Sequence, residues 1–230
     1  MNLSQPLDRT RSATVIAAPG RHPRSITIVD YGMGNLRSVA KVVSRLGADV
    51  RVSSDPADLT WADRLILPGV GAFPDAMRSL RELNLIDALN EEVLARKKPI
   101  LGICLGMQLM AKSSAELVDT EGLGWFDATM VSFDRSKGIR VPHIGWNRVN
   151  LKRPIALFDG FDDGSFCYFV HSYHMLCADP SSVVATTNYG YDFVSVIARD
   201  NIFGTQFHPE KSQAAGSIVL INFVTGTLDL

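Results

Sequence analysis

The sequence predicts an α/β domain with a central, largely parallel sheet flanked by helices, extended by short antiparallel strands in the second half. Two observations support this fold class. In the first half, short apolar runs alternate with helical patterns, and such alternation implies right-handed crossovers between parallel strands. In the second half, strand-like segments follow one another with only turn residues between them, which is typical of antiparallel pairing.

The first half contains four predicted strands and the helices that connect them. The strands are predicted at residues 26–29, 50–52, 65–67 and 99–103, where apolar side chains concentrate. The helices are predicted at residues 36–46, 75–96 with a break near Asn84, and 105–111. Asn35 is the expected N-cap of the first helix, and Gly47 is expected to end it.

The second half contains six predicted strands and a final helix. The strands are predicted at residues 128–133, 148–151, 166–170, 183–188, 194–199 and 202–206. The helix is predicted at residues 213–224, with Ser212 as its cap. Because residues 25–230 contain no linker, repeat or low-complexity segment, we expect them to form one domain.

Composition excludes several classes of protein. The formal net charge is −1 and there is no long Lys/Arg run, so a nucleic-acid partner is not expected. No apolar run reaches the roughly 18 residues that a membrane-spanning helix needs, so a membrane protein is not expected either. The three cysteines do not form a disulfide pattern, which favours a reducing, cytoplasmic setting.

Residues 1–24 differ from the rest of the chain. They carry Arg9, Arg11, Arg21 and Arg24 against a single acidic residue. An Arg-rich, acid-poor start can resemble an organelle transit peptide. A disordered N-terminal extension, or a misplaced start codon, is the interpretation we prefer, because several Pro and Gly residues disfavour a helix there.

Cys104 is the strongest candidate for a catalytic residue. It lies between Gly102 and Gly106 where a predicted strand becomes a helix, which is the arrangement of a nucleophile elbow with Cys in place of Ser. The glycines would allow a sharp turn, and the N-terminus of the following helix would favour the thiolate. An isolated buried Cys is usually structural, and that interpretation is retained for Cys167 and Cys177.

A thiol nucleophile requires a general base, and His208 is the best placed of the five histidines. It ends a predicted strand, and Pro209 keeps it extended. In an extended segment the side chains of His208 and Glu210 point to similar sides, so Glu210 could orient the imidazole. A Cys–His–Glu triad is therefore predicted, although the tripeptide alone would suggest a surface turn.

A tetrahedral intermediate needs hydrogen-bond donors for its oxyanion. The N–H of Leu105, directly after the nucleophile, is one candidate. The second is expected from the loop at 68–71, where the glycines that flank Val70 would let its peptide rotate. Without the predicted triad, an ordinary Pro-Gly turn would be the preferred interpretation.

The segments at 102–108 (GICLGMQ) and 207–211 (FHPEK) resemble class I, triad-type glutamine amidotransferases. Three further segments, at 30–36 (DYGMGNL), 68–73 (PGVGAF) and 142–147 (PHIGWN), resemble one group within that family, the glutaminase subunits of imidazole glycerol phosphate synthases. The resemblance covers about residues 25–230.

This resemblance implies the class I glutamine amidotransferase fold and assigns roles to particular residues. Gln108 would hold the substrate L-glutamine beside the nucleophile, and Glu116 would bind its amino-acid end. The main chain around His171, Ser172 and Tyr173 would line the same pocket, and the amide of Val70 would be a mobile oxyanion donor. No cofactor and no metal are expected.

The resemblance also implies a partner, a (β/α)8-barrel cyclase subunit with which the chain would form a heterodimer in histidine biosynthesis. Ammonia would pass into that barrel, which converts a phosphoribulosyl-formimino nucleotide into imidazole glycerol phosphate and an aminoimidazole carboxamide ribotide. The residues expected towards the interface are Asn35, Pro142, Trp146, Asn147 and Lys211.

Three alternatives remain open from the sequence. The triad could belong to another amidotransferase, such as one that serves pyridoxal phosphate synthesis, or to a fold-related cysteine hydrolase. The chain could also be a non-catalytic subunit that stabilises a partner. A metal site at His171 and His174 is a weaker hypothesis, because no Cys or carboxylate completes a ligand set at suitable spacing.

Overall fold

A computed structural model describes residues 24–228 of the 230-residue chain. The predicted N-terminal extension therefore lies, except for Arg24, outside the described residues. The first half of the chain alternates strands and helices as predicted. Its elements are β1 (Ser25–Val29), α1 (Leu36–Arg45), β2 (Asp49–Ser53), α2 (Pro56–Trp61), β3 (Arg64–Gly69), α3 (Phe73–Glu82), α4 (Leu85–Asn90), the π-helix η1 (Glu91–Ala95), β4 (Ile100–Cys104) and α5 (Leu105–Gln108).

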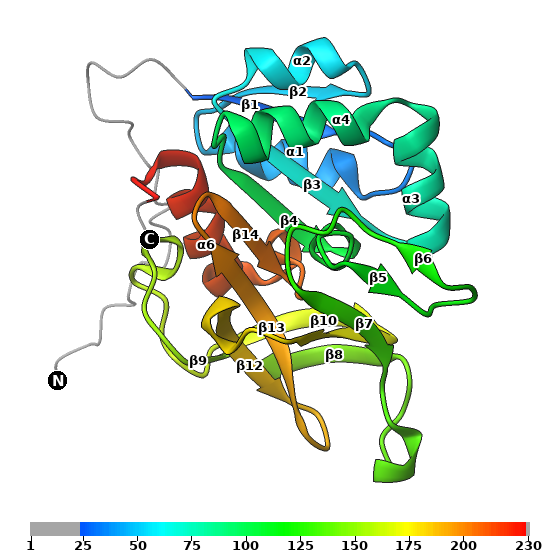
Figure 1. Ribbon diagram of the computed structural model, residues 1–230. Coiled ribbons are helices and arrows are strands. Elements are labelled where there is room, and N and C mark those ends of the chain that lie inside the picture. Colours follow the sequence, from blue (N-terminus) through cyan, green and yellow to red (C-terminus); the bar gives the residue numbers. More distant parts are fainter. Residues whose placement is uncertain (1–23, 229–230) are drawn as a thin grey trace, which may run out of the picture.

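The second half is mostly β-structure and ends in a long helix (Figure 1). Its strands are β5 (Ser113–Ser114), β6 (Thr120–Glu121), β7 (Ala128–Ser132), β8 (His143–Arg148), β9 (Asn150–Leu151), β10 (Phe166–His171), β11 (Tyr173–Cys177), β12 (Val183–Asn188), β13 (Asp192–Arg199) and β14 (Ile202–Thr205). The 3₁₀ turns are η2 (Arg135–Lys137), η3 (Ala156–Phe158), η4 (Pro180–Ser182) and η5 (Pro209–Lys211), and the last helix is α6 (Gln213–Thr225).

One large sheet runs through the molecule in the order β2-β1-β3-β4-β14-β13-β11-β7-β5-β6. The first five of these strands are parallel, and β13, β11 and β7 continue the sheet in antiparallel fashion. Strands β12 and β9 extend it beside β13, while β8 and β10 form a separate antiparallel ribbon. The predicted fold class, a largely parallel central sheet followed by antiparallel strands, is confirmed.

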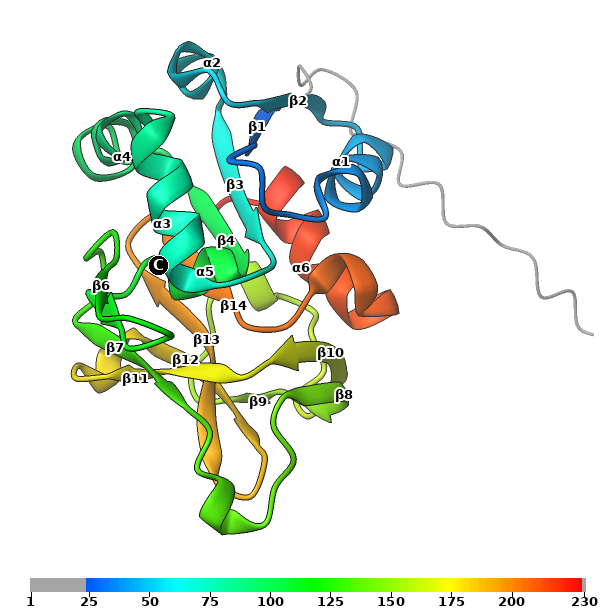
Figure 2. The ribbon, with the colours of Figure 1, turned by 90° about the vertical axis from the view of Figure 1, so that its right-hand side faces the viewer.

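Two hydrophobic cores cover the two faces of the parallel strands. Helices α1 and α6 lie on one side of these strands, and α3 and α4 lie on the other (Figure 2). Successive strand residues alternate between the cores: Ile66 belongs to the core that α1 and α6 cover, whereas Leu65 and Leu67 belong to the core beneath α2, α3 and α4. This alternation follows from the two-residue period of a strand. A strand that is buried on both faces reads as a continuous apolar run, which is why β3 and β4 were predictable.

Several local predictions need correction. Asn35 is at the N-cap position of α1, but its side chain makes no capping hydrogen bond. Ser212 does not cap α6 either, because its hydroxyl donates to the carbonyl of His208 and accepts from the N–H of Tyr168. By contrast, Gly47 ends α1 with φ +89°, and Asn84 breaks the second helical segment with φ 54°, as predicted.

Some elements escaped prediction from the sequence. Helix α2 begins at Pro56 with Asp55 as a capping side chain, a signal that the sequence did contain. Strand β8 carries exposed Ile144 and Trp146 and lacks a buried apolar alternation. The predicted strand at 202–206 does form, as β14, but it pairs parallel to β4 and thereby completes the parallel core.

Within the described residues, no helix is long and apolar enough to cross a membrane.

Candidate active site

The carboxyl ends of three neighbouring parallel strands build one edge of the site. In the sheet, β4 lies between β3 and β14, with Gly69 opposite Cys104 and Thr205 opposite Ile103. The segments that leave these strands therefore meet at the same edge, which is where parallel α/β sheets place their ligand sites. This topology brings Cys104 close to His208, although 104 positions separate them in the sequence.

Cys104 has the backbone strain expected of a nucleophile elbow. Its φ of 55° and ψ of −109° place it in a conformation that L-residues rarely adopt. The flanking glycines permit the close packing that imposes this turn. A Cβ on Gly106 would collide with the carbonyl oxygen of Leu67, and a Cβ on Gly102 would lie 2.8 Å from the carbonyl of Gly106.

The helix predicted to follow the nucleophile at 105–111 is much shorter than expected. It is a single turn, α5, after which turn-type hydrogen bonds carry the chain to Ala111. A helix dipole is the sum of many aligned peptide units, so one turn contributes only part of the electrostatic effect that the sequence suggested. The N–H of Leu105 still lies immediately after Cys104, at the start of this turn.

His208 and Glu210 form a buried pair. Nδ1 of His208 lies 2.9 Å from Oε1 of Glu210, and only 2% and 1% of the two side chains are exposed. Burial by itself would lower the pKa of His208, but its interactions with Cys104 and Glu210 outweigh burial and raise that pKa to about 9. The imidazole is therefore held in its protonated form at neutral pH.

The second ring nitrogen of His208, Nε2, is buried and makes no aligned hydrogen bond within residues 24–228. The sulfur of Cys104 instead contacts the carbonyl oxygen of Val170 at 3.8 Å. Catalytic hydrogen bonds are often long or poorly aligned before substrate binds, so this geometry is compatible with a catalytic pair.

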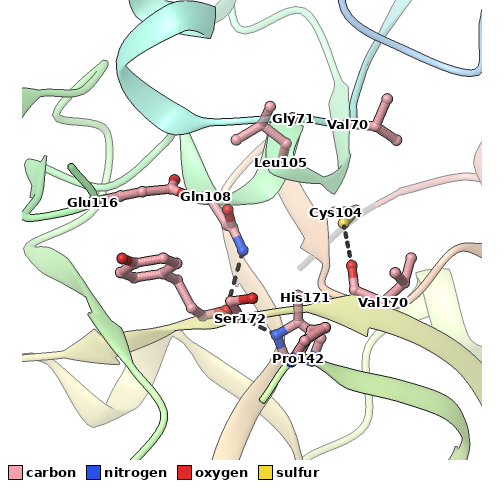
Figure 3. A pocket seen from close by; sticks show the side chains of 11 residues that line it. Val70, Gly71, Cys104, Leu105, Gln108, Glu116, Pro142, Val170, His171 and Ser172 are labelled. Carbon is pink, nitrogen blue, oxygen red and sulfur yellow. Dashed lines mark hydrogen bonds between the residues drawn. The ribbon is translucent and has the colours of Figure 1, made fainter.

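A pocket of about 320 Å³ opens in front of Cys104 (Figure 3). Its size is at the lower end of the range for small-molecule sites. Every residue that the sequence assigned to substrate or oxyanion binding contributes to its wall. The lining residues are Val70, Gly71, Cys104, Leu105, Gln108, Glu116, Pro142, Val170, His171, Ser172 and Tyr173.

Two anchored side chains supply polar groups to this pocket. The carboxylate of Glu116 accepts the N–H of Phe73 at the start of α3, at 2.8 Å. Nε2 of Gln108 donates to the carbonyl oxygen of Tyr173 at 3.2 Å and to Oε1 of Gln206 at 3.1 Å. Gln206 was not singled out from the sequence, although it lies two residues before His208, directly after β14.

Behind the pocket, two buried histidines form a directional chain of hydrogen bonds. Nδ1 of His171 must carry a proton, because it faces the carbonyl oxygen of Tyr173 at 2.8 Å. Nε2 of His171 is then the acceptor for Nδ1 of His143, at 3.0 Å. Nε2 of His143 in turn faces the amide nitrogen of Asn147 at 3.3 Å. Burial lowers the pKa of His143 to about 4 and that of His171 to about 3, so both imidazoles are neutral.

The expected interface residues lie around the β8–β10 ribbon and η5. Trp146 is 46% exposed and packs edge-on against Tyr168, whose ring is 5.7 Å from Nζ of Lys211. Pro142 is exposed at the rim of the pocket, and Asn35 precedes α1, which packs against η5. Asn147 differs from the others, because its amide turns inward to His143 and to the carbonyl of Asn188.

The hypothesis of a metal site at His171 and His174 gains no support from their surroundings. His171 is engaged with His143 and Tyr173, whereas His174 contacts the hydroxyl of Tyr191 at 3.0 Å. Among the described residues, no cluster of three or more His, Cys, Asp or Glu could hold a metal ion.

Comparison with known families agrees with this geometry. Residues 27–225 match the model of the family described as glutamine amidotransferase class-I. The chain belongs to this family. Solved structures of a glutamine amidotransferase, with a TM-score of 0.67 at 18% identity over 86% of this chain and 99% of the other, and of a second one from Thermotoga maritima, with a TM-score of 0.58 at 20% identity over 83% and 77%, share its fold.

Closer relatives narrow the similarity to one kind of subunit. The chain is 50% identical, over 86% of its length and 96% of the relative, to the imidazole glycerol phosphate synthase subunit HisH of Sulfurimonas denitrificans. It is 47% identical, over 86% of its length and 98% of the relative, to subunit HisH 1 of Campylobacter jejuni.

Proposed function

We propose that this chain is the glutaminase subunit of an imidazole glycerol phosphate synthase and hydrolyses L-glutamine to glutamate and ammonia with Cys104, His208 and Glu210. The observation that carries the proposal is the strained Cys104 in the wall of the pocket, beside a buried His208 that Glu210 orients. The family match supports glutamine as the substrate, and the similarity to imidazole glycerol phosphate synthase subunits supports the choice of synthase.

The proposed reaction has two steps through one thioester. The sulfur of Cys104 attacks the side-chain carbonyl carbon of glutamine, and His208 delivers its proton to the leaving ammonia as the C–N bond breaks. His208 then takes a proton from water, whose oxygen attacks the carbonyl carbon of the glutamyl thioester. The C–S bond breaks, glutamate leaves, and the thiolate of Cys104 and the protonated His208 are restored. Glu210 holds the tautomer of the imidazole and stabilises its charged form.

The oxyanion of each tetrahedral intermediate would be bound by the N–H groups of Leu105 and Val70. Val70 is 41% exposed, and Gly71 beside it has φ +115°, a conformation that favours glycine. The hydroxyl of Tyr31 donates to the carbonyl of Pro68 at 2.8 Å and so fixes the start of this loop. A rotation would then be confined to the peptide between Gly69 and Val70, and it would switch one oxyanion donor on or off.

The proposed partner is a (β/α)8-barrel cyclase subunit that receives the ammonia. Neutral ammonia is the nucleophile, and a closed passage would prevent its protonation and loss. The relatives are named as subunits of a synthase, which supports a multisubunit assembly. Exposed Ile144, Trp146 and Phe166 on the β8–β10 ribbon supply an apolar surface of the kind that partner subunits cover. Asn35, Pro142, Asn147 and Lys211 are assigned to the same interface or its margin.

The decisive experiment compares glutamine-dependent with ammonia-dependent synthesis by the reconstituted complex. Cys104→Ala is expected to abolish glutamine use and to leave ammonia-dependent synthesis intact, with Cys177→Ala as the matched control that loses neither. Glutamine use by the Cys104→Ala complex at the wild-type rate would refute the triad. The loss of both activities would indicate a stabilising role only.

Coupling between the subunits is tested by the same complex. Glutaminase activity is expected to rise when the nucleotide ligand of the barrel is added, because one oxyanion donor is worth on the order of 10²–10³ in turnover. If the isolated chain hydrolyses glutamine as fast as the liganded complex, the Gly69–Val70 switch is wrong. Activation by a pyridoxal phosphate synthase barrel instead would favour the alternative amidotransferase.

We further propose that residues 25–230 act as one domain and that the protein works in the cytoplasm. One continuous sheet joins both halves of the described chain, which supports the first point. Limited proteolysis of the full chain tests it, since one stable fragment of about that extent is expected.

A further inference from the structure

Gln206 connects two residues of the pocket and takes no part in the proposed thioester steps. Its side chain is fully buried, and its amide lies between Gln108 and Cys104. The backbone N–H of Gln206 donates to the carbonyl of Ser195 on β13 at 2.9 Å, which fixes the residue at the end of β14. A buried amide needs partners for both of its ends, so the identity of those partners determines its orientation.

The orientation of both amides follows from one carbonyl group. The carbonyl oxygen of Tyr173 can only accept, so the Gln108 atom that faces it at 3.2 Å must be Nε2. Nε2 of Gln108 gives its second N–H to Gln206 at 3.1 Å, and the receiving atom must therefore be Oε1. The remaining end of Gln206 is Nε2, a donor, and it lies 3.7 Å from Sγ of Cys104.

We propose that Gln206 is a positioning residue, which donates a hydrogen bond to the sulfur of Cys104 and holds Gln108 so that its oxygen faces the substrate. A donor at the sulfur favours the negatively charged nucleophile over the neutral thiol. One N–H of Gln108 donates to the carbonyl of Tyr173 (Figure 3) and the other to Gln206, so the remaining group of its amide is an acceptor, Oε1. The pocket thus offers an oxygen to an N–H-bearing group of the ligand, either the carboxamide or the α-ammonium group of glutamine.

The two functions of Gln206 can be separated by substitution. In Gln206→Glu, a carboxylate still accepts from Gln108 but cannot donate to Cys104 and places a negative charge beside its sulfur. In Gln206→Leu, both contacts disappear without a buried charge, so this variant remains informative if the Glu variant does not fold. Ser195→Ala is the control, because it alters a buried side chain on the neighbouring strand whose hydroxyl makes no hydrogen bond within residues 24–228.

The first measurement is the pH dependence of Cys104 alkylation by iodoacetamide in the full-length chain, with the modified residue identified by mass spectrometry. The midpoint is expected to move to higher pH in Gln206→Glu and, by less, in Gln206→Leu, and to stay unchanged in Ser195→Ala. Unchanged midpoints in both Gln206 variants would overturn the interaction with sulfur. A loss of thermal stability without a change in midpoint would show a merely structural role and would overturn it as well.

The second measurement is the glutaminase activity of the reconstituted complex, and this part of the inference rests on the proposed function. Gln206→Glu is expected to lower kcat by about ten- to a hundredfold, the range for a hydrogen bond to a charged group, with a smaller effect on KM. Gln206→Leu is expected to raise KM as well, because Gln108 becomes free to turn. Wild-type kcat and KM in both variants would refute the positioning role.

The two measurements test the proposed function and the role of Gln206 separately. If the wild-type complex had no glutaminase activity, the proposed function would be wrong, yet the alkylation profile would still test the contact between Gln206 and Cys104. If the complex were active and the alkylation midpoints did not respond to Gln206, the proposed function would stand and this inference would be rejected.

Discussion

Two buried histidine regions lie beside the pocket and differ in charge. On the side of the parallel strand ends, His208 contacts the carboxylate of Glu210, and its pKa is raised to about 9 despite burial. On the side of β8, β10 and β11, His143 and His171 contact each other and neutral groups, and burial lowers their pKa values to about 4 and 3. Burial alone therefore does not set the charge of an imidazole. The presence of a compensating negative group decides whether a buried histidine is a proton donor or a neutral hydrogen-bond relay.

The largest expected effect comes from removing the charge that distinguishes the two regions. Glu210→Gln keeps the shape of the side chain but cannot stabilise the imidazolium, and its amide can hold the wrong tautomer of His208. The glutaminase kcat of the complex is expected to fall by roughly 10²–10⁴, as for the corresponding change in other triads. Glu210→Asp, which retains the charge, should lose less. If Glu210→Gln reduced kcat by no more than a few-fold, the carboxylate would not be what sets the two histidine regions apart.

An effect of intermediate size is expected in the pH dependence of folding stability. The pKa of His208 is raised from its ordinary 6.5 to about 9, so its contribution is fully present below pH 6.5 and is lost as the pH rises through about 9. The pKa of His171 is lowered from 6.5 to about 3, so its contribution is present above pH 6.5 and is lost as the pH falls towards 3. Over the whole shift, each loss should be on the order of 3–5 kcal/mol.

Urea unfolding at pH 4.5, 7 and 9.5 measures how much stability is lost on the acidic side and on the alkaline side. His208→Phe is expected to flatten the alkaline side of the stability profile only, and His171→Phe the acidic side only. Each variant thus serves as the control for the other. A flattening on the same side in both variants would contradict the opposite charge states of the two regions.

The smallest expected effect concerns the neutral relay itself. His143→Leu leaves Nε2 of His171 buried without a donor, which should destabilise the protein by about 1–3 kcal/mol. It should raise the glutamine KM only a few-fold, because Tyr173 and Gln108 lose support indirectly. His143→Asn can retain a donor near the position of Nδ1 and should lie closer to the wild type. Thermal unfolding and glutaminase kinetics are measured for both variants. If His143→Leu and His143→Asn had the same stability and the same KM, the chain of hydrogen bonds would have no role.

The parts of the fold that the sequence predicted well are those that local pattern decides. Strands β3 and β4 are apolar on both faces, and Gly47 and Asn84 interrupt helices at positions that require positive φ. Strand β8 escaped detection because its apolar side chains, Ile144 and Trp146, face outward. Its inward positions carry His143 and Asn147, whose burial depends on partners that are distant in the sequence.

The candidate site divides in a similar way. Cys104, His208 and Glu210 could be found because each stands in a short motif whose chemistry is specific. Gln206 gave no such signal, since a glutamine before an apolar residue is common on any surface. Its contacts arise only in the folded protein, where β14 pairs parallel to β4 and brings the amide of Gln206 against Gln108 and Cys104.

The sequence by itself determined the alternation of strands and helices, the strained turn at Cys104 and the residue types of the triad, because these depend on local sterics and on spacing along the chain. Only the tertiary structure decided which strand lies beside β4, that α5 is a single turn, and that His208 is charged while His143 and His171 are neutral. Those outcomes depend on the burial and hydrogen-bond partners of groups far apart in the chain, and the free energy of a buried polar group is set by the partners that the fold brings to it.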